Sequence, residues 1–397
     1  MKGTTNMHLS KLGVVGGGIM GGGIIQVLLN AGFAVAFMEL DQDLLDKALQ
    51  KVEKIFRSAR EKGLITQDEV QEKMGYVKGS TSYGIFSDAD LVIEAVPERL
   101  EIKGEVFKAL DAICRPEIIL ATNTSSLSIS QLGSLTQRPQ KVIGMHWFNP
   151  PHIMKLVEIV PGLVTSQDAV DTLIDLCKRL GKTPVQVKEC AGFLVNRLLG
   201  IYVNEALFLV QERQSPQEVD LAAEGLGIPM GPLRLGEMVG WDTIYRANTS
   251  LFHEYGSRFS VPPLLAELYE TEHWGSKAGK GLYQYERSGA VEAQRDAAVD
   301  STDLSTRLLS IMFNEGIRCL DERVASSRDI DTALKVGAGM PKGPLQWTDQ
   351  MGLDRLLNQL ETFMQSCGER FLPAPLLRRK VAAGHLGRGR GIGFYEY

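Results

Sequence analysis

Short apolar runs alternate with longer amphipathic stretches over residues 11–190 of the chain. The runs are rich in Val, Ile and Leu and begin near Lys11, Ala34, Leu91, Ile118 and Val142. Runs of this kind, bounded by Gly or polar residues, are typical of buried strands, and the stretches between them carry apolar residues at helical spacing. Strands that alternate with helices in this way predict an α/β domain with a doubly wound sheet.

Beyond residue 190 the pattern becomes helical, beginning with a long apolar helix over residues 192–213, and it then repeats. Several residues return at one displacement: Pro229, Pro232, Gly240 and Asp242 recur as Pro341, Pro344, Gly352 and Asp354, each 112 residues later. A fixed displacement of this kind indicates two copies of one helical domain.

These patterns predict four segments. Residues 1–189 form the α/β domain, residues 190–288 the first helical domain, residues 289–303 a linker, and residues 304–397 a degenerate second helical domain. The linker is predicted because this part of the chain is polar and rich in Ser, Gly and Ala. The predicted fold class is therefore a doubly wound α/β sheet followed by two tandem all-α domains.

Composition narrows the classes of function. Hydrophobic residues make up 44% and charged residues 23% of the 397 positions, which is ordinary for a soluble globular protein. The net charge of −5 disfavours nucleic-acid binding, and no apolar run reaches the roughly 20 residues that span a bilayer. The five cysteines form neither a CxxC pair nor a cluster with histidines, so we expect a cytoplasmic location and no metal site.

A glycine-rich turn follows the first predicted strand. Gly16, Gly18 and Gly21 form the pattern G-x-G-x-x-G before an apolar helix, and the next strand ends at Glu39. Such glycines let the backbone approach a pyrophosphate at the helix N-terminus, while the acid binds the adenosine ribose and repels a 2′-phosphate. The alternative is a turn that binds nothing. The full context favours an NAD site, with predicted contacts at Gly16, Gly18, Ile19, Met20, Gly21 and Glu39.

The segment 142–158 carries the candidate chemistry. A short β-branched run leads to His146, Asn149-Pro150-Pro151 interrupts regular structure, and a second apolar run holds Glu158. A loop between two strands holds a histidine exposed yet rigid, and a carboxylate on the second strand can return to it. We hypothesise that His146 and Glu158 form an acid–base dyad. The alternative is a hydrogen-bonded core histidine and a solvated strand glutamate.

Polar residues also follow two other predicted strands. Glu98 and Lys103 follow the run at residues 91–96, at the edge where a doubly wound sheet binds its ligands. They are candidate cofactor contacts, or else an ordinary helix-start acid and a surface lysine. Residues 123–126, Asn-Thr-Ser-Ser, are either a polar loop at the same edge or an N-cap cluster for the next helix.

A basic face follows the second strand. The amphipathic helix predicted over residues 41–62 carries Lys47, Lys51 and Lys54 at helical spacing and ends near Lys62. A solvated face balanced by acidic residues is the ordinary explanation. The functional alternative is a basic face that binds a phosphate-bearing part of the substrate.

Five motifs together resemble one family. They are VVGGGIMGGG (14–23), DLVIEAVPERLEIK (90–103), TNTSSLS (122–128), HWFNPPHIMKLVE (146–158) and GFLVNR (192–197). The chain resembles the L-3-hydroxyacyl-CoA dehydrogenase family, which includes 3-hydroxybutyryl-CoA dehydrogenases, over residues 12–285. The resemblance implies a Rossmann-type NAD-binding domain and an enzyme of fatty acid β-oxidation.

The resemblance also implies catalytic roles. His146 is the implied base, Glu158 orients it, and Ser125 and Asn196 hold the substrate oxygen. Histidine suits the task because its unperturbed pKa of ~6.5 lets it take the alcohol proton as hydride leaves the carbon. A carboxylate on the other ring nitrogen fixes the tautomer and stabilises the imidazolium. The implied reaction is the reversible, metal-free oxidation of L-3-hydroxyacyl-CoA to 3-ketoacyl-CoA.

Binding roles follow from the same resemblance. The implied cofactor contacts outside the glycine turn are Glu98, Lys103, Ser125, Asn149 and Lys277, and the implied coenzyme A contacts are Lys62 and Ser125. The sequence departs from the family pattern at Trp147, Glu39 and Ala191, where Phe, Asp and Pro are usual. These departures leave the reaction intact and the choice of substrate open.

Two other functions are weighed against this one. A related NAD-dependent dehydrogenase of a free 3-hydroxy (sugar) acid uses the same chemistry. A scaffolding protein that binds NAD without turnover is disfavoured, because all four implied catalytic positions are intact.

The two helical copies are not equivalent. Near the start of the copies the displacement is 110, so Asn196 corresponds to Thr306, and farther along it is 112, so Lys277 corresponds to Gly389; the second copy therefore lacks both implied contacts. We therefore expect one active site per chain, with an acyl-CoA substrate and no nucleic-acid or membrane partner. Short members of the family dimerise through their single helical domain. A tandem copy is expected to occupy that surface and give a monomeric pseudo-dimer.

Overall fold

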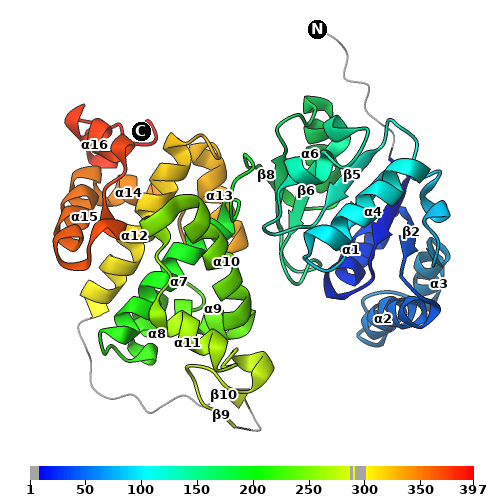
Figure 1. Cartoon of the computed structure of the whole chain (residues 1–397), viewed down its shortest axis with the longest axis horizontal. Helices are drawn as coiled ribbons and strands as arrows, with labels where there is room; N and C mark the ends of the chain where they lie inside the picture. Colours follow the sequence, from blue (N-terminus) through cyan, green and yellow to red (C-terminus); the bar gives the residue numbers. More distant parts are fainter. Residues whose placement is uncertain (1–8, 287–288, 291–300) are drawn as a thin grey trace. The chain divides into compact units, whose positions relative to one another are not determined.

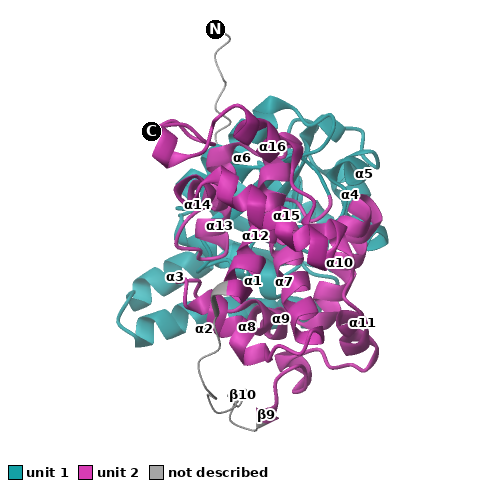
Figure 2. Cartoon of the chain, turned by 90° about the vertical axis from the view of Figure 1, so that its left-hand side faces the viewer, with its two compact units in different colours: residues 1–190 teal, residues 191–397 magenta. Residues whose placement is uncertain are grey.

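The computed structural model describes residues 9–286, 289–290 and 301–397, and the chain divides into two compact units, unit 1 (residues 1–190) and unit 2 (residues 191–397) (Figures 1 and 2). Most of the predicted linker, 289–303, falls outside the described residues, and a helix already begins at Ser301. Within the described residues, no helix combines the length and apolar character needed to cross a membrane.

Within its described residues, unit 1 is built on an eight-stranded sheet with the order β3-β2-β1-β4-β5-β6-β7-β8. Its strands are β1 (Lys11–Val15), β2 (Ala34–Met38), β3 (Val77–Ser80), β4 (Leu91–Glu94), β5 (Ile119–Thr122), β6 (Val142–Trp147), β7 (Leu156–Pro161) and β8 (Thr183–Gln186). Neighbouring strands are parallel except β6 and β7, which are antiparallel. The central strands are apolar on both faces because helices cover both sides of the sheet.

Helices connect the strands of unit 1. They are α1 (Ile19–Asn30), α2 (Gln42–Glu61), α3 (Gln67–Gly75), α4 (Leu100–Ile113), α5 (Ile129–Gly133) and α6 (Gln167–Arg179), with 3-10 turns η1 (Tyr83–Phe86) and η2 (Pro139–Lys141). Side chains of α1, α2 and α6 share one apolar cluster with the strands. Local caps determine where helices begin: Asp41 accepts the N–H of Leu44 at α2, and Thr66 and Glu69 form a capping box at α3. The predicted doubly wound α/β fold is confirmed.

Strands β1 and β4 are parallel neighbours at the centre of the sheet, and the direction in which successive strands are added reverses between them. Strands β2 and β3 extend from one side of β1, whereas β5 and β6 extend from β4 on the other side. In open α/β sheets, ligands bind at the carboxyl ends of the two strands that flank such a reversal. The glycine-rich turn follows β1, and the segment with Glu98 and Lys103 follows β4.

Unit 2 is helical apart from the short pair β9 (Tyr285–Glu286) and β10 (Gly289–Ala290), within the part of the chain that the structure describes. Its first copy contains α7 (Val195–Gln211), α8 (Pro216–Glu224), α9 (Pro232–Val239), α10 (Trp241–Tyr255), η3 (Gly256–Phe259), α11 (Pro263–Glu270) and η4 (Ser276–Ala278). Its second copy contains α12 (Ser301–Asp321), α13 (Ser327–Gly337), α14 (Pro344–Met351), α15 (Leu353–Cys367), η5 (Glu369–Phe371), α16 (Pro375–Ala382) and η6 (Arg388–Arg390). The equivalent long helices α7 and α12 pack against each other (Figure 2).

Buried carboxylates hold the two copies of unit 2 in the same way. Asp220 accepts two N–H groups from the first turn of α9, at 2.8 and 3.0 Å, and the hydroxyl of Tyr283 at 2.6 Å. Asp331 accepts the matching groups of α14 at 2.8 and 3.0 Å and the hydroxyl of Tyr395 at 2.6 Å. Each carboxylate thus caps a helix that begins with Pro and ties the end of its copy to the core. The repeat seen in the sequence extends to these contacts.

Candidate functional site

The glycine-rich turn has the shape that a pyrophosphate requires. Gly16 has a φ of +91°, and a Cβ on Gly21 would lie 1.8 Å from the carbonyl oxygen of Gly16. Only glycine therefore lets α1 begin this close to β1. Gly18, the N-cap residue of α1, has open space where a Cβ would be and no side-chain cap, so the first N–H groups of the helix remain available to an anion.

Side chains around the turn complete this half of the site. Ile19 is exposed, whereas Met20 packs against the core cluster. Glu39, just after β2, accepts the N–H of Gly17 at 2.5 Å, so its carboxylate lies against the turn. The turn and its acid fit the pyrophosphate and the adenosine ribose of NAD.

The register of β6 and β7 brings the candidate dyad together. His146 is paired with Glu158 across the two antiparallel strands, and His146 Nδ1 lies 2.6 Å from Glu158 Oε2. The prediction of an exposed loop histidine was wrong: β6 continues through Trp147, and 6% of the His146 surface is exposed. The alternative of a solvated glutamate was also wrong, because Glu158 is completely buried.

A buried ion pair lies at the carboxyl end of β4. Lys103 Nζ lies 2.7 Å from Glu94 Oε1, and both side chains are buried. Glu94 also accepts the hydroxyl of Thr122 at 2.6 Å and the N–H of Val96 at 2.7 Å. The surface-lysine alternative for Lys103 was therefore wrong. Glu94 was not among the predicted site residues, although a charged residue within an apolar strand run is a signal for it.

Glu98 organises the loop after β5. Its Oε1 accepts the hydroxyl of Thr124 at 2.6 Å and the N–H groups of Ser125 and Ser126 at 2.8 and 3.1 Å. Burial raises the pKa of Glu98, but the nearby Lys103 and these hydrogen bonds lower it more, so the pKa lies below its usual value. The carboxylate is thus ionised at neutral pH and draws the strand end of β4 and the Ser125 loop together.

The N-cap alternative for residues 123–126 was wrong. Helix α5 is capped by Ser128, whose hydroxyl accepts the N–H of Gln131 at 3.0 Å. Asn123 serves instead to join two strand ends, because its Oδ1 accepts the N–H of Trp147 at 2.9 Å.

The loop after β6 carries Asn149 in an exposed position. Lys182 stabilises this loop through two hydrogen bonds. Its Nζ donates to the carbonyl oxygen of Pro151 and to that of Met154, the latter at 2.7 Å. Burial lowers the pKa of Lys182, and the neighbouring Lys155 lowers it further. Near the carboxyl ends of β4, β5 and β6 therefore lie the predicted residues Glu98, Ser125 and Asn149 in loops, Lys103 in the first turn of α4 and His146 in β6 itself.

The other predicted residues have simpler surroundings. Asn196 is the second residue of α7, which the chain enters through Gly192 and Phe193 with φ values of +70° and +48°. Lys277 lies in η4 and forms an ion pair with Asp242. Lys62 is the exposed C-cap residue of α2.

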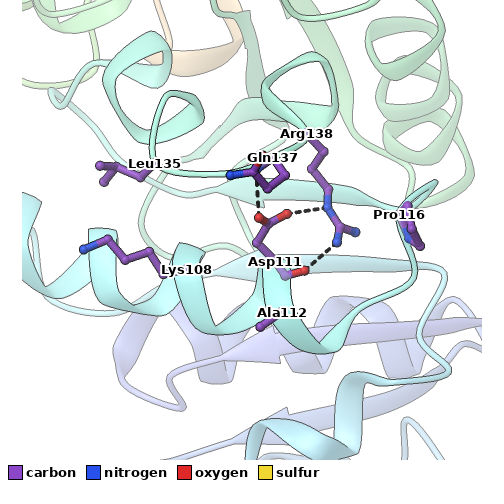
Figure 3. A pocket seen from close by; sticks show the side chains of 7 residues that line it. All are labelled: Lys108, Asp111, Ala112, Pro116, Leu135, Gln137 and Arg138. Carbon is purple, nitrogen blue, oxygen red and sulfur yellow. Dashed lines mark hydrogen bonds and ion pairs between the residues drawn. The ribbon is translucent and has the colours of Figure 1, made fainter.

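A hollow of about 450 Å³ in unit 1 lies apart from these residues (Figure 3). Its lining residues are Lys108, Asp111, Ala112, Pro116, Leu135, Gln137 and Arg138. The hollow lies beside the C-terminal end of α4, near the start of β5. The Ser125 loop follows the other end of β5. Arg138 donates to the Asp111 carboxylate at 2.7 Å and to the carbonyl oxygens of Asp111 and Cys114 at 2.6 and 3.0 Å. Its guanidinium therefore caps α4 and does not form a second reactive centre.

The fold and these contacts define the class of protein: an α/β dinucleotide-binding domain with a histidine–carboxylate pair at its strand ends is the arrangement of a nicotinamide-dependent oxidoreductase. Family comparisons agree. The model of the 3-hydroxyacyl-CoA dehydrogenase NAD binding domain matches residues 11–190, and that of the 3-hydroxyacyl-CoA dehydrogenase C-terminal domain matches residues 192–285 and 304–397. The chain belongs to the 3-hydroxyacyl-CoA dehydrogenase family of NAD-dependent oxidoreductases. The predicted family and the predicted cofactor, NAD, are confirmed.

Individual relatives and solved structures support the same family. The fatty acid oxidation complex subunit alpha of Vibrio cholerae is 35% identical over 95% of this chain, and the chain spans 55% of that protein's length. The crystal structure of 3-hydroxybutyryl-CoA dehydrogenase from Escherichia coli K12 aligns over 95% of this chain and 99% of its own, with a TM-score of 0.87 and 28% identity. The (S)-3-hydroxybutyryl-CoA dehydrogenase of Ralstonia eutropha covers 70% of this chain and 100% of its own, with a TM-score of 0.68 and 35% identity.

Proposed function

We propose that this protein catalyses the reversible NAD-dependent oxidation of L-3-hydroxyacyl-CoA to 3-ketoacyl-CoA, in the setting of fatty acid oxidation that its relatives' names indicate. The observation that carries the proposal is the buried His146–Glu158 pair, 2.6 Å apart, in a domain of the NAD-binding family. A histidine held by a carboxylate can exchange a proton with a secondary alcohol near neutral pH. The proposed location remains the cytoplasm, as the cysteine usage predicts.

In the proposed mechanism, bound NAD supplies the hydride acceptor, and the side chains handle the proton and the substrate oxygen. Glu158 Oε2 lies beside Nδ1 of His146 and keeps that nitrogen protonated, which leaves Nε2 to accept the alcohol proton. The buried carboxylate then stabilises the imidazolium. Ser125 and Asn196 donate hydrogen bonds to the substrate oxygen as it becomes a carbonyl oxygen. In the reverse direction His146 returns the proton.

Binding contacts complete the proposal. Glu98, Lys103, Asn149 and Lys277 contact the cofactor, together with the glycine-rich turn. Lys62 contacts the coenzyme A moiety. Support for this last role comes from the outer face of α2, where the side chains of several lysines are exposed. A cationic face of this kind attracts the phosphate groups of coenzyme A.

The direct test is an assay of the purified protein with acetoacetyl-CoA and NADH. We expect consumption of NADH that requires the CoA thioester, and a panel of 3-ketoacyl-CoA chain lengths will define the preferred substrate. Free 3-hydroxy acids with NAD form the second arm. Activity in that arm alone would contradict the proposed substrate class and favour a free-acid dehydrogenase.

We also propose that the chain is a monomer in which the two helical copies form a pseudo-dimer. Support comes from an exchange of charges inside unit 2, in which an arginine of each copy bonds two glutamates of the other: Arg197 bonds Glu315 and Glu322, and Arg307 bonds Glu205 and Glu212. Within this exchange, Arg307, Glu315 and Glu322 each lie 110 positions after their counterparts Arg197, Glu205 and Glu212. Reciprocal contacts of this kind are the signature of an interface with two-fold character.

Light scattering tests this arrangement. A monomer should give a molar mass near 43.7 kDa at micromolar concentrations. The reason is that the surface through which a single helical domain would pair with another chain is already used by the second copy. A mass near twice this value, with an interface formed by the first copies of two chains, would show the proposal to be wrong.

A further inference from the structure

The loop that carries Ser125 is held at two ends by carboxylates. Glu98 binds its first part, through Thr124 and the N–H groups of Ser125 and Ser126. A second carboxylate, Glu189, binds its last part. Glu98 follows β4 and is a proposed cofactor contact, whereas Glu189 has so far been assigned no role.

Glu189 makes three hydrogen bonds to the start of α5. Its Oε1 accepts the hydroxyl of Ser128 at 2.7 Å and the N–H of Ser130 at 2.9 Å, and its Oε2 accepts the hydroxyl of Ser130. The Ser130 hydroxyl in turn accepts the N–H of Leu163 at 2.8 Å, just after β7. One carboxylate thus joins the β5–α5 loop, the end of β7 and the segment after β8.

Hydrogen bonds and one peptide bond link the two carboxylates. The Thr124 hydroxyl donates to Glu98 and accepts the N–H of Leu127 at 2.9 Å, and Ser128 comes next and donates to Glu189. Ser125 lies inside this bonded segment, so its position depends on both ends. Loss of either carboxylate would let the loop shift, and a shift of about 1 Å in a group that meets the reacting centre is sufficient to reduce turnover markedly.

We propose that Glu189 is a positioning residue of the dehydrogenase reaction, acting through Ser128 and Ser130 on the loop that carries Ser125. This inference rests on the proposed function, in which Ser125 holds the substrate oxygen. Glu189 is also the next-to-last residue of unit 1.

The test is a double-mutant cycle with Ser125, read as kcat for acetoacetyl-CoA reduction at saturating NADH. Glu189→Ala should lower kcat about tenfold in the otherwise native protein, but less than about twofold in the Ser125→Ala background, because the residue through which it acts is already gone. Glu189→Gln keeps an acceptor oxygen for Ser128 and a donor for Ser130, so it should restore at least about half of the native kcat.

Ser166→Ala is the matched control. Ser166 accepts the N–H of Ala169 at 3.3 Å and caps α6 in the same unit. Its loss should leave kcat within about twofold of native while lowering the melting temperature. If Glu189→Ala does not fold, Ser128→Ala, which removes one of the three donors, replaces it in the cycle.

The outcomes separate the two proposals. Native kcat in Ser125→Ala would overturn the role of Ser125 and the inference with it. A second outcome would overturn the inference but not the role of Ser125. In it, Ser125→Ala lowers kcat, and Glu189→Ala lowers kcat by the same factor in the native protein and in the Ser125→Ala background. Native kcat in Glu189→Ala would do the same.

Discussion

Replacement of His146 by alanine should lower kcat for acetoacetyl-CoA reduction by at least about 100-fold, the low end of the range for a positioned acid–base group. In the variant no side chain can deliver the proton to the carbonyl oxygen while hydride arrives at the carbon. Glu158 would remain buried without the imidazole that it faces at 2.6 Å, so it cannot take over the task. Steady-state kinetics at saturating NADH would measure the effect.

His152 provides a matched control for this experiment. It is an exposed histidine in the loop after β6, so His152→Ala removes the same side chain from the same region. We expect its kcat to remain within about twofold of native, which would show that proximity to the site is not sufficient. A native rate in His146→Ala would show that the acid–base dyad hypothesis is wrong.

The largest effect on stability is expected at Arg197. Its completely buried guanidinium lies 2.7 Å from carboxylate oxygens of both Glu315 and Glu322 and receives an additional partner in the Tyr255 hydroxyl at 3.0 Å. Arg197→Met would leave the buried Glu315 without this partner. Removal of one member of a buried ion pair typically costs about 3–5 kcal/mol, and we expect a loss of this size in the free energy of unfolding of unit 2. Urea denaturation would measure it.

An exposed pair serves as the comparison. Arg57 and Glu53 lie one helical turn apart on α2 with their charged groups in water, 2.6 Å from each other. Arg57→Met should therefore change the free energy of unfolding by less than about 1 kcal/mol. Equal losses in the free energy of unfolding of the two variants would mean that burial does not determine how much the Arg197 contacts stabilise the protein.

Much of the fold and part of the site could be predicted from the sequence, because both depend on local patterns. Apolar runs placed the central strands, and the glycine-rich turn placed the junction between β1 and α1. The meeting of His146 and Glu158 followed from two short strands joined by one loop. Its burial did not follow, because the point at which a strand ends depends on the pairing partner, and β7 extends the pairing through Trp147.

The remainder depends on contacts between distant segments. Glu94 meets Thr122, which is 28 positions away, and Glu189 meets Ser128 at a separation of 61 positions. Neither acid differs from a surface acid in its local sequence, except that Glu94 interrupts an apolar run. The repeat revealed that the helical copies are related, but their crossed ion pairs join residues 95 to 125 positions apart and form only when α7 packs against α12.

The crossed arginines have a consequence for how the two copies can evolve. Each copy holds the counter-charges of the other, since Arg197 pairs with Glu315 and Arg307 with Glu205. A substitution at one of these positions therefore removes the counter-charge of a residue encoded 118 or 102 codons away. Loss of the second copy would therefore leave Arg197, Glu205 and Glu212 of the first copy without the partners that it supplies. The positions of the second copy equivalent to Asn196 and Lys277 are Thr306 and Gly389, which take no part in this exchange.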